Sequence, residues 1–219
     1  MAPVVRICSI SAYATVGSRI NLSALSILLK ELYRIDNSFD NTRVRRKHDS
    51  IEALTSSKTF FNSLSFPLTF RTQYKVHNLH VRIFTTGTLH ITGASDYEVT
   101  IKNAFLLVFG LISACHLKEE TLDVIENTSM FCLKNMRVAM IHSIYHHSKS
   151  IDREKTASEL QRMGRNVRYD SKLHNAINVR FNDNNGTFLI FKSGKIIVTG
   201  CKYIDICTKE LESLIPLLI

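Results

Sequence analysis

The sequence predicts an α+β fold built from two related half-domains, because one segment of the chain is duplicated. The fifteen residues from Val81 to Ser95 return as Phe188 to Lys202, with five identical positions and mostly similar residues at the others. Each copy reads as a strand, a glycine turn and a second strand ending in Thr-Gly, and a helical pattern follows each copy. A supersecondary unit therefore occurs twice. We expect two pseudo-symmetric halves, with an antiparallel sheet on one side and helices on the other.

The elements of the first half follow in order from their periodicity. A candidate strand covers Val4 to Tyr13, and an amphipathic helix follows from Arg19 to Leu32 with Asn21 as its N-cap. After the duplicated strands, Ser95 to Glu98 has the Ser-x-x-Glu form of a capping box. A long helix is then predicted by apolar residues at helical spacing, namely Ile101, Ala104, Phe105, Val108 and Ile112.

The second half repeats this order of elements. A candidate strand covers Met136 to Tyr145, and a helix follows from Ser150 to Met163 with Asp152 in the capping place. The counterpart of the long helix is the stretch from Ile204 to Ile219. Each half is thus predicted to consist of a strand, a helix, several strands and a long helix, in that order.

The distance between equivalent positions indicates an insertion in the first half. The separation in residue number is 131 between Ile20 and Ile151, and it falls to 107 between Phe84 and Phe191. The polar, basic stretch 42–58 accounts for most of this surplus. The first half therefore carries a basic insert of unassigned role.

The repeats define the expected domain boundaries. The first repeat covers residues 1–118 and the second covers residues 135–219. The residues between them, 119–134, form a linker, in which 119–127 is expected to be a short helix.

Composition narrows the class of protein. The 219 residues, 45% of them hydrophobic, suffice for one substantial core or two smaller ones. The net charge of +9 favours a polyanionic partner such as nucleic acid, although ribosomal and membrane-surface proteins carry similar charge. Five cysteines without CxxC spacing and an N-terminus without a secretory pattern indicate a reducing, intracellular setting. The most apolar stretch, 104–114, is too short to cross a bilayer.

The second copy of the duplicated segment carries a family resemblance. The pattern Ile-Phe-x-Ser-Gly-Lys-x-x-x-Thr-Gly-x-Lys, intact from Ile190 to Lys202 and degraded from Ile83 to Ser95, resembles the signature of the TATA-binding protein (TBP) family. The resemblance extends over roughly 4–118 and 135–219, and parts of the second half look like the divergent TBP-like proteins of large DNA viruses. The family implies a saddle, with a curved antiparallel sheet on the DNA minor groove and helices on the convex face.

The family bends DNA by inserting side chains between base steps, and TBP is itself the usual example of this mechanism. By alignment, the wedge positions are Phe61 and Phe84 in the first half and His174 and Phe191 in the second. The alternative for a strand phenylalanine is packing in the core. The resemblance implies that these four side chains meet the groove.

The same alignment assigns residues to the floor of the groove. They are Ser9, Thr92, Ile177, Ile197 and Thr199. Threonine hydroxyls can bond the acceptor atoms of A·T pairs, although threonine is also common in any strand. His90 stands where the family has an apolar residue, and Ser9 and Met140 replace its two central asparagines. Strict selectivity for TATA sequences is therefore left open.

Basic residues at family phosphate positions occur in the second half only. They are Arg180, Lys195 and Lys202, whose first-half equivalents are Pro67, Thr88 and Ser95. The basic insert could replace them through Arg43, Arg45, Arg46 and Lys47, or these residues could form an ordinary solvated surface.

Enzymatic motifs do not stand out in the sequence. It shows no paired carboxylates, nucleophile elbow or glycine-rich phosphate loop, so no catalysis and no cofactor are expected. His142, His146 and His147 suggest a metal cluster, but their segment reads as strand and turn rather than as the helix such a site needs. Metal binding is not expected.

Two main functions from different classes and one further alternative remain. The first is a non-enzymatic transcription initiation factor that binds A·T-rich double-stranded DNA as a monomer, with B-type general factors and RNA polymerase as partners by resemblance and no membrane. The second is a protein-interaction scaffold of the same fold that has lost specific DNA binding, and an accessory domain of a nucleic-acid enzyme is a third reading. The expected location is intracellular, in a nucleus or, for a viral protein, in a viral factory or virion.

Overall fold

The computed structural model of the chain describes residues 3–36, 62–72, 75–118, 122–181 and 186–219. These residues form two compact units. The N-terminal unit is Ala12–Arg137, and the C-terminal unit is Val138–Ile219 together with Met1–Ser11. The boundaries between these units fall within two strands, β1 (Arg6–Thr15) and β5 (Lys134–His146). They therefore differ from the boundaries that the sequence repeat predicts. The repeat-based division at 118 and 135 stays a prediction.

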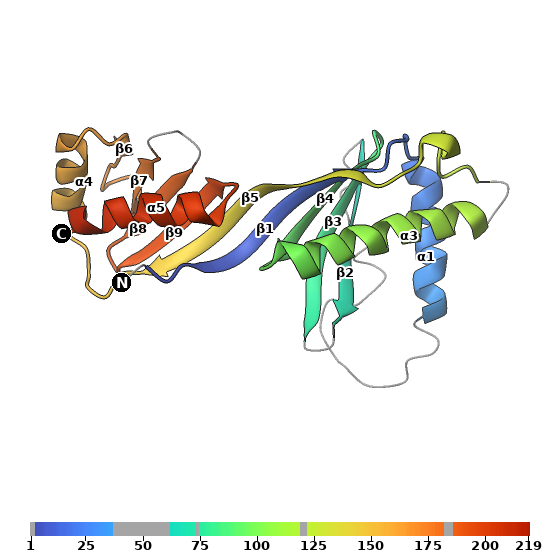
Figure 1. Cartoon of the computed structure of the whole chain (residues 1–219), viewed down its shortest axis with the longest axis horizontal. Coiled ribbons are helices and arrows are strands. Elements are labelled where there is room, and N and C mark those ends of the chain that lie inside the picture. Colours follow the sequence, from blue (N-terminus) through green and yellow to red (C-terminus); the bar gives the residue numbers. More distant parts are fainter. Residues whose placement is uncertain (1–2, 37–61, 73–74, 119–121, 182–185) are drawn as a thin grey trace. The chain divides into compact units, whose positions relative to one another are not determined.

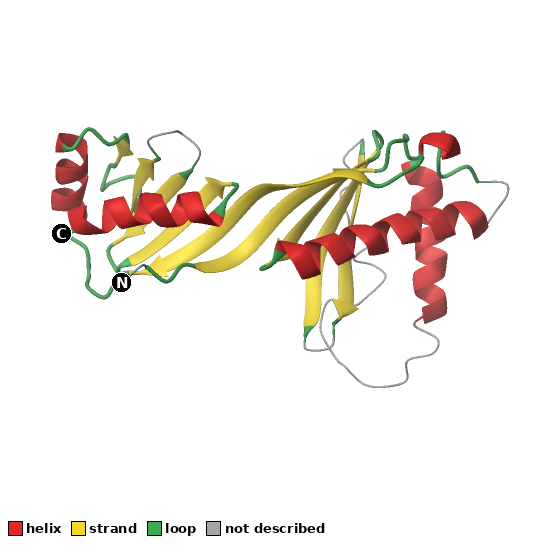
Figure 2. Cartoon of the chain, viewed as in Figure 1, coloured by secondary structure: helices red, strands yellow, loops and turns green. Residues whose placement is uncertain are grey.

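The N-terminal unit contains a sheet with strand order β2-β3-β4-β1, and helices cover one of its faces (Figures 1 and 2). Its strands are β1 (Arg6–Thr15), β2 (Ser63–Arg71), β3 (Val76–Phe84) and β4 (Thr88–Ala94). Its helical elements are α1 (Leu22–Asp36), a short π-helix (Tyr97–Ile101) and α3 (Lys102–Lys118). The basic insert 42–58 lies outside the described residues.

The C-terminal unit repeats this plan with strand order β5-β9-β8-β7-β6 (Figure 1). Its strands are β5 (Lys134–His146), β6 (Val167–Arg168), β7 (Ala176–Arg180), β8 (Thr187–Phe191) and β9 (Lys195–Cys201). Its helices are α4 (Arg153–Arg162) and α5 (Ile204–Leu214), followed by a 3-10 turn (Ile215–Leu217). The predicted α+β class and the predicted order of elements in both halves are confirmed.

The strand pairs of the two units share one register. Phe84 pairs with Ser63 in the first unit, and its repeat equivalent Phe191 pairs with Ala176 in the second. The next hairpin matches too, with the pairs Ile83–Leu89 and His80–Thr92 against Ile190–Ile196 and Thr187–Thr199. The duplication read from the sequence therefore holds at the level of individual strand pairs.

The glycine turn is duplicated down to its hydrogen bonds. Gly87 has φ 78° and Gly194 has φ 82°, both in the left-handed region where a Cβ is unfavourable. The Gly87 carbonyl accepts from Val16 N–H at 2.9 Å, and the Gly194 carbonyl accepts from His147 N–H at 2.8 Å. These bonds attach the end of the first strand of each half to the same turn.

The helix starts show two confirmed caps and one correction. Asn21 Oδ1 accepts from Ala24 N–H at 3.2 Å, and Asp152 Oδ1 accepts from Lys155 N–H at 3.1 Å, as predicted. The predicted capping box at Ser95 is wrong, because Asp96 caps instead, accepting from the N–H groups of Val99 and Thr100. Burial alone would raise the pKa of Asp96, but these bonds and one from the Thr100 hydroxyl lower it. A carboxylate is the stronger acceptor at a helix start.

The predicted short helix over 119–127 is also wrong in the part that the structure describes. Ile125 instead forms an isolated β-bridge with Ile20, and a 3-10 turn follows at Thr128–Met130. The backbone here is drawn into strand-like pairing beside the start of α1, which overrides the local helical pattern.

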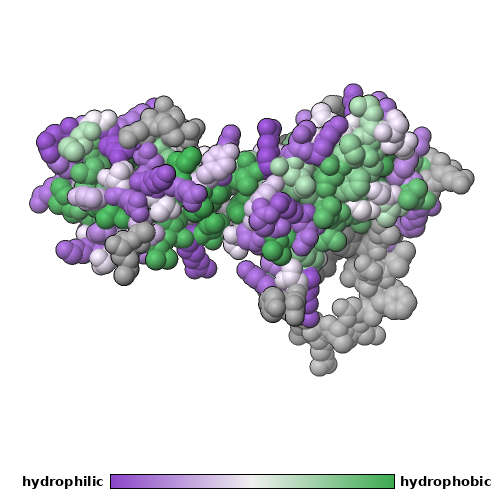
Figure 3. Space-filling model, in the orientation of Figure 1, coloured by the Kyte–Doolittle hydropathy of each residue, from purple (hydrophilic) through white to green (hydrophobic). Residues whose placement is uncertain are grey.

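The long helix α3 belongs to the core. With the preceding π-helix it forms one helix, Tyr97–Lys118, which is long and apolar enough, by length and composition, to cross a membrane. One side of α3 is fully buried in the unit, through Ala104, Phe105, Val108, Ile112 and Cys115. Apolar and polar surface are interspersed on the side of the chain that carries this helix (Figure 3). This pattern is that of a core helix lying on a sheet.

Candidate nucleic-acid interface

Strand alternation gives the strands of each unit a face that the helices do not cover, here called the open face. In β9, Ile196 and Val198 are fully buried in the helix-covered core, whereas Lys195, Ile197 and Thr199 between them are partly exposed. The same alternation occurs in β4, β7 and β8. Successive side chains of a strand point to opposite faces, so the partly exposed set lies on the open face.

Two of the four predicted wedge residues occupy equivalent places on the open faces. Phe84 and Phe191 are each partly exposed and each begin the duplicated turn, in which the glycine N–H donates to the phenylalanine carbonyl at 2.9 and 3.0 Å. A large apolar ring is thus held at the end of a hairpin in each unit. Phe61 lies outside the described residues.

The fourth wedge position, His174, lies two residues before β7. Its side chain is exposed, and its backbone N–H donates to the carbonyl of Asp170 at 2.9 Å, which closes a turn. The strand itself begins at Ala176, which is opposite Phe191. His174 is therefore a loop residue near the end of the hairpin that carries Phe191.

Of the predicted floor residues, Thr92, Ile197 and Thr199 lie on the open faces. Ser9 is partly exposed in β1. The Thr199 hydroxyl lies 3.6 Å from Met140 Sδ, so the residue that replaces a family asparagine touches a predicted floor threonine.

The assignment of Ile177 to the floor is wrong. Its side chain is fully buried in the core cluster of the C-terminal unit, on the helix-covered face, and it pairs with the equally buried Ile190. Because alternation puts residue 177 on the core face, its neighbour Asn178 takes the open-face position.

The predicted phosphate contacts lie at three different places. Arg180 is exposed at the end of β7, and Lys202 is exposed between β9 and α5. Lys195 is partly exposed at the start of β9, opposite His146. Their uncharged equivalents in the N-terminal unit include exposed Pro67 and Ser95. The charge difference between the two halves is thus present at the surface.

Comparisons with known proteins agree with this geometry. A family model described as "Transcription factor TFIID (or TATA-binding protein, TBP)" matches residues 141–219. The "TATA-box-binding protein-like" protein of Acanthamoeba polyphaga mimivirus is 24% identical, over 92% of this chain and 61% of that protein. The solved structure of Methanococcus jannaschii TBP superposes with a TM-score of 0.57 at 18% identity, covering 98% of each chain. The chain thus resembles the TBP family in sequence and has a TBP-type fold.

The superposition confirms the predicted TBP-type fold, while the viral likeness agrees with the resemblance read from the sequence. The chain spans about 61% of the length of that viral relative.

The structure adds functional candidates that the sequence reasoning missed, on the open face of the N-terminal unit. Arg82 lies beside His90 across the β3–β4 pair, and its Nε donates to Ser65 Oγ at 3.2 Å. Tyr13 stacks on His90, with ring centroids 4.4 Å apart and an interplanar angle of 16°. His80 is exposed on the same face of β3. Alternate residues of a strand lie on the same face, so the sequence could have predicted that His80 and Arg82 share a face with Phe84.

Burial and charge affect the two histidines of this face in the same direction. Burial lowers the pKa of His90, and the neighbouring Arg82 and His80 lower it further. The pKa of His80 is lowered first by burial and then by Arg82. Both rings therefore hold the neutral form, which has one donor and one acceptor nitrogen, to a lower pH than a free histidine does.

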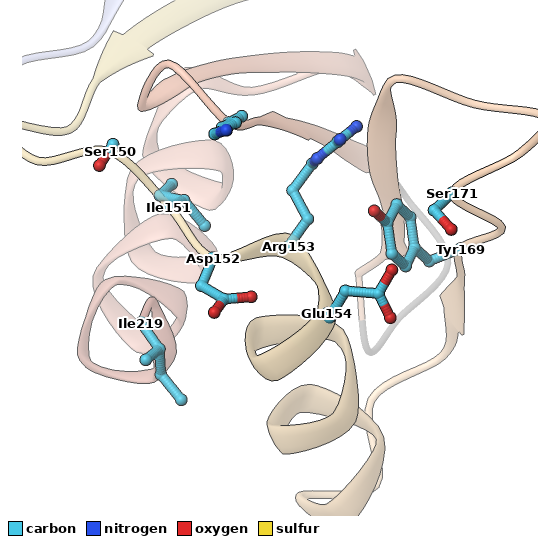
Figure 4. A pocket seen from close by; sticks show the side chains of 9 residues that line it. Ser150, Ile151, Asp152, Arg153, Glu154, Tyr169, Ser171 and Ile219 are labelled. Carbon is cyan, nitrogen blue, oxygen red and sulfur yellow. The ribbon is translucent and has the colours of Figure 1, made fainter.

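A pocket of about 470 Å³ in the C-terminal unit adds two more basic residues (Figure 4). Arg153 extends from the start of α4, lies 5.7 Å from the centre of the Tyr169 ring, and donates from Nη1 to the Asn175 carbonyl at 2.8 Å. Lys192, which directly follows Phe191, also lines the pocket. The hydrogen bond from Arg153 to Asn175 links the loop that contains His174 to the start of α4, and Lys192 is adjacent in sequence to the predicted wedge Phe191.

Two buried thiols and the arrangement of possible metal ligands differ, within the described residues, from what reactive sites need. No group of three or more His, Cys, Asp or Glu that could hold a metal ion occurs within the described ranges. Burial raises the pKa of the Cys115 thiol to about 11, and burial together with Cys201 raises the pKa of Cys207. Such thiols stay protonated and make poor nucleophiles.

Proposed function

We propose that this TBP-like protein is a non-enzymatic transcription initiation factor that binds double-stranded DNA through the minor groove and bends it. The observation that carries the proposal is the pair Phe84 and Phe191. Each ring stands on an open face, at the first position of a turn whose hydrogen bonds are the same in both units. A chance pair of surface phenylalanines would not occupy equivalent positions in one shared register.

The physical chemistry of the open faces supports groove binding. An apolar wedge between base steps costs unstacking energy, which is offset by the additional protein surface that a bent duplex contacts. The net charge of +9 supplies attraction to phosphates irrespective of sequence. Thr92 and Thr199 offer hydroxyls that can donate to the A N3 and T O2 acceptors of A·T pairs.

The partners and the location follow from the same family resemblance. By family resemblance the bound duplex is A·T-rich at least in part, the protein binds it as a monomer, and B-type general factors and RNA polymerase assemble on the complex. The action is intracellular, in a nucleus or, for a viral protein, in a viral factory or virion.

Energy transfer between labels on the two ends of a short duplex tests the bending. Binding brings the ends closer, and Phe191→Ala reduces that change more than it reduces charge-driven association. The matched control is Phe70→Ala. It removes a ring that stacks on His77, at the end of the β2–β3 pair opposite to Phe84. An end-to-end distance that does not change at saturation would exclude the wedge mechanism.

His174 provides a second test of the same mechanism. The imidazole is smaller than a phenyl ring and carries polar nitrogens that lose solvent on insertion. If its loop position meets the groove, His174→Phe increases bending at saturation. Bending equal to that of the wild type would show that this position is not a wedge.

The alternative function is a scaffold of the same fold without specific DNA binding, and the polar open face of the N-terminal unit favours it. Titration of A·T-rich and G·C-rich duplexes at several salt concentrations separates the two functions. A weak response that is independent of sequence at every salt concentration would support the scaffold.

A further inference from the structure

The two open faces differ in chemistry at equivalent positions. Across β2, β3, β4 and β1 the N-terminal unit carries a polar row, formed by Ser65, Arg82, His90 and Tyr13. Across β7, β8, β9 and β5 the C-terminal unit carries the equivalent row, formed by Asn178, Leu189, Ile197 and Ile144, in which the last three side chains are apolar. The register is the same in both, so the difference lies in the side chains alone.

The minor groove offers one chemical distinction that such rows can detect. A·T and T·A pairs present only the acceptors A N3 and T O2, whereas G·C pairs add the amino group of guanine, a donor that stands out from the groove floor. Against Leu189, Ile197 and Ile144 this donor would be buried without a partner, which is costly. The three apolar side chains of this row therefore select A·T pairs.

The polar row meets the same amino group differently. The imidazoles of His80 and His90 and the hydroxyls of Ser65 and Tyr13 are acceptors, and the Arg82 guanidinium can donate to groove acceptors that every base pair has. The contacts from Arg82 to Ser65 and from Tyr13 to His90 fix the orientation of these groups. The lowered histidine pKa values preserve the neutral rings, which keep an acceptor nitrogen.

We propose that the N-terminal unit accommodates G·C pairs in its half of the bound duplex, through the row Ser65, Arg82, His90 and Tyr13, while the C-terminal unit requires A·T pairs. This inference rests on the proposed minor-groove binding. It also gives the protein a fixed direction on DNA, because the two half-sites are chemically different.

Inosine provides the experiment, because it pairs with cytosine but lacks the guanine amino group. Single G·C and I·C pairs are placed in turn along an otherwise A·T duplex, and the affinity of the full chain is measured. In one half of the site we expect G·C to weaken binding about tenfold or more, with I·C restoring it. In the other half we expect G·C to be tolerated, with I·C giving no gain.

A pair of double variants assigns the halves. Arg82→Leu/His90→Ile copies the residues of the C-terminal row, and we expect it to bind the all-A·T duplex while losing tolerance of G·C in the tolerant half. Leu189→Arg/Ile197→His makes the converse exchange and should relax the other half. Circular dichroism and the all-A·T affinity show that each variant is folded.

The outcomes separate this inference from the function on which it rests. Equal G·C penalties in both halves of the site, or unchanged profiles in both double variants, overturn the inference and leave minor-groove binding standing. Absence of specific binding to every duplex overturns both. If specific DNA binding is absent and a protein binds through the polar row, that face is a protein-contact surface instead.

Discussion

The N-terminal and C-terminal units have the same strand register but different surfaces. On the helix-covered faces, equivalent residues are alike and fully buried, as in Ile83 with Ile190, Leu89 with Ile196 and Ile91 with Val198. On the open faces, equivalents such as Arg82 and Leu189 have opposite character. The core face determines whether a half-domain folds, whereas the open face is free to change with whatever it contacts. Divergence between the repeats is therefore a guide to function.

The largest expected effect tests the part that the units share. Gly87→Ala places a Cβ 2.0 Å from the Ser18 carbonyl oxygen, and Gly194→Ala places one 2.6 Å from the carbonyl oxygens of His147 and Lys149, both at positive φ. We expect each to lower the free energy of unfolding by more than about 2 kcal/mol. Urea unfolding measures both.

The control for this prediction is Gly110→Ala in α3. A Cβ there has no neighbour within 4 Å, so helix propensity alone should stabilise the protein by about 1 kcal/mol. If Gly87→Ala and Gly194→Ala are as harmless as Gly110→Ala, the duplicated turn does not have the geometry described.

The next prediction tests the charge difference between the units. Arg180→Ala and Lys202→Ala should each lower the slope of log affinity against log salt by about 0.9, because one phosphate contact fewer releases about one counterion fewer. Pro67→Ala and Ser95→Ala, at the equivalent first-half positions, should leave the slope unchanged. Similar slopes for all four variants would mean that Arg180 and Lys202 do not contact phosphate.

The sequence predicted the features that depend on repetition and alternation. The halves, the order of their elements, the Asn21 and Asp152 caps and the placement of Phe84 and Phe191 at equivalent turns all follow from the duplication. A repeated pattern limits each copy by the other, so local ambiguity is reduced.

The wrong predictions arose where one signal was used alone. Ile177 was assigned to the groove by resemblance, although its alternation with Phe191's partner Ala176 places it on the core face. Ser95 was chosen as a cap by motif, and the adjacent carboxylate of Asp96 accepts more strongly. Arg82 and His80 were missed because they precede the signature segment Ile83–Ser95, within which the departure at His90 was noticed.

The smallest expected effect is a pH dependence confined to the N-terminal unit. Because the pKa values of His80 and His90 are lowered in the folded state, the unfolded chain binds protons more readily at mildly acidic pH. The stability of this unit should be complete above about pH 6.5, the usual histidine value, and should fall as the pH drops from there toward the lowered values. The equivalent residues of the C-terminal unit, Thr187 and Ile197, do not titrate in this range.

Urea unfolding followed by methyl NMR signals resolves the two units, since Ile91 reports on one core and Val198 on the other. Between pH 7.5 and pH 5.5 the Ile91 midpoint should move to lower urea relative to the Val198 midpoint. His80→Thr/His90→Ile, which copies the C-terminal residues, should make the two midpoints move together. A midpoint difference that persists in this variant would falsify the assignment to these histidines, and would place the acid sensitivity elsewhere in the N-terminal unit.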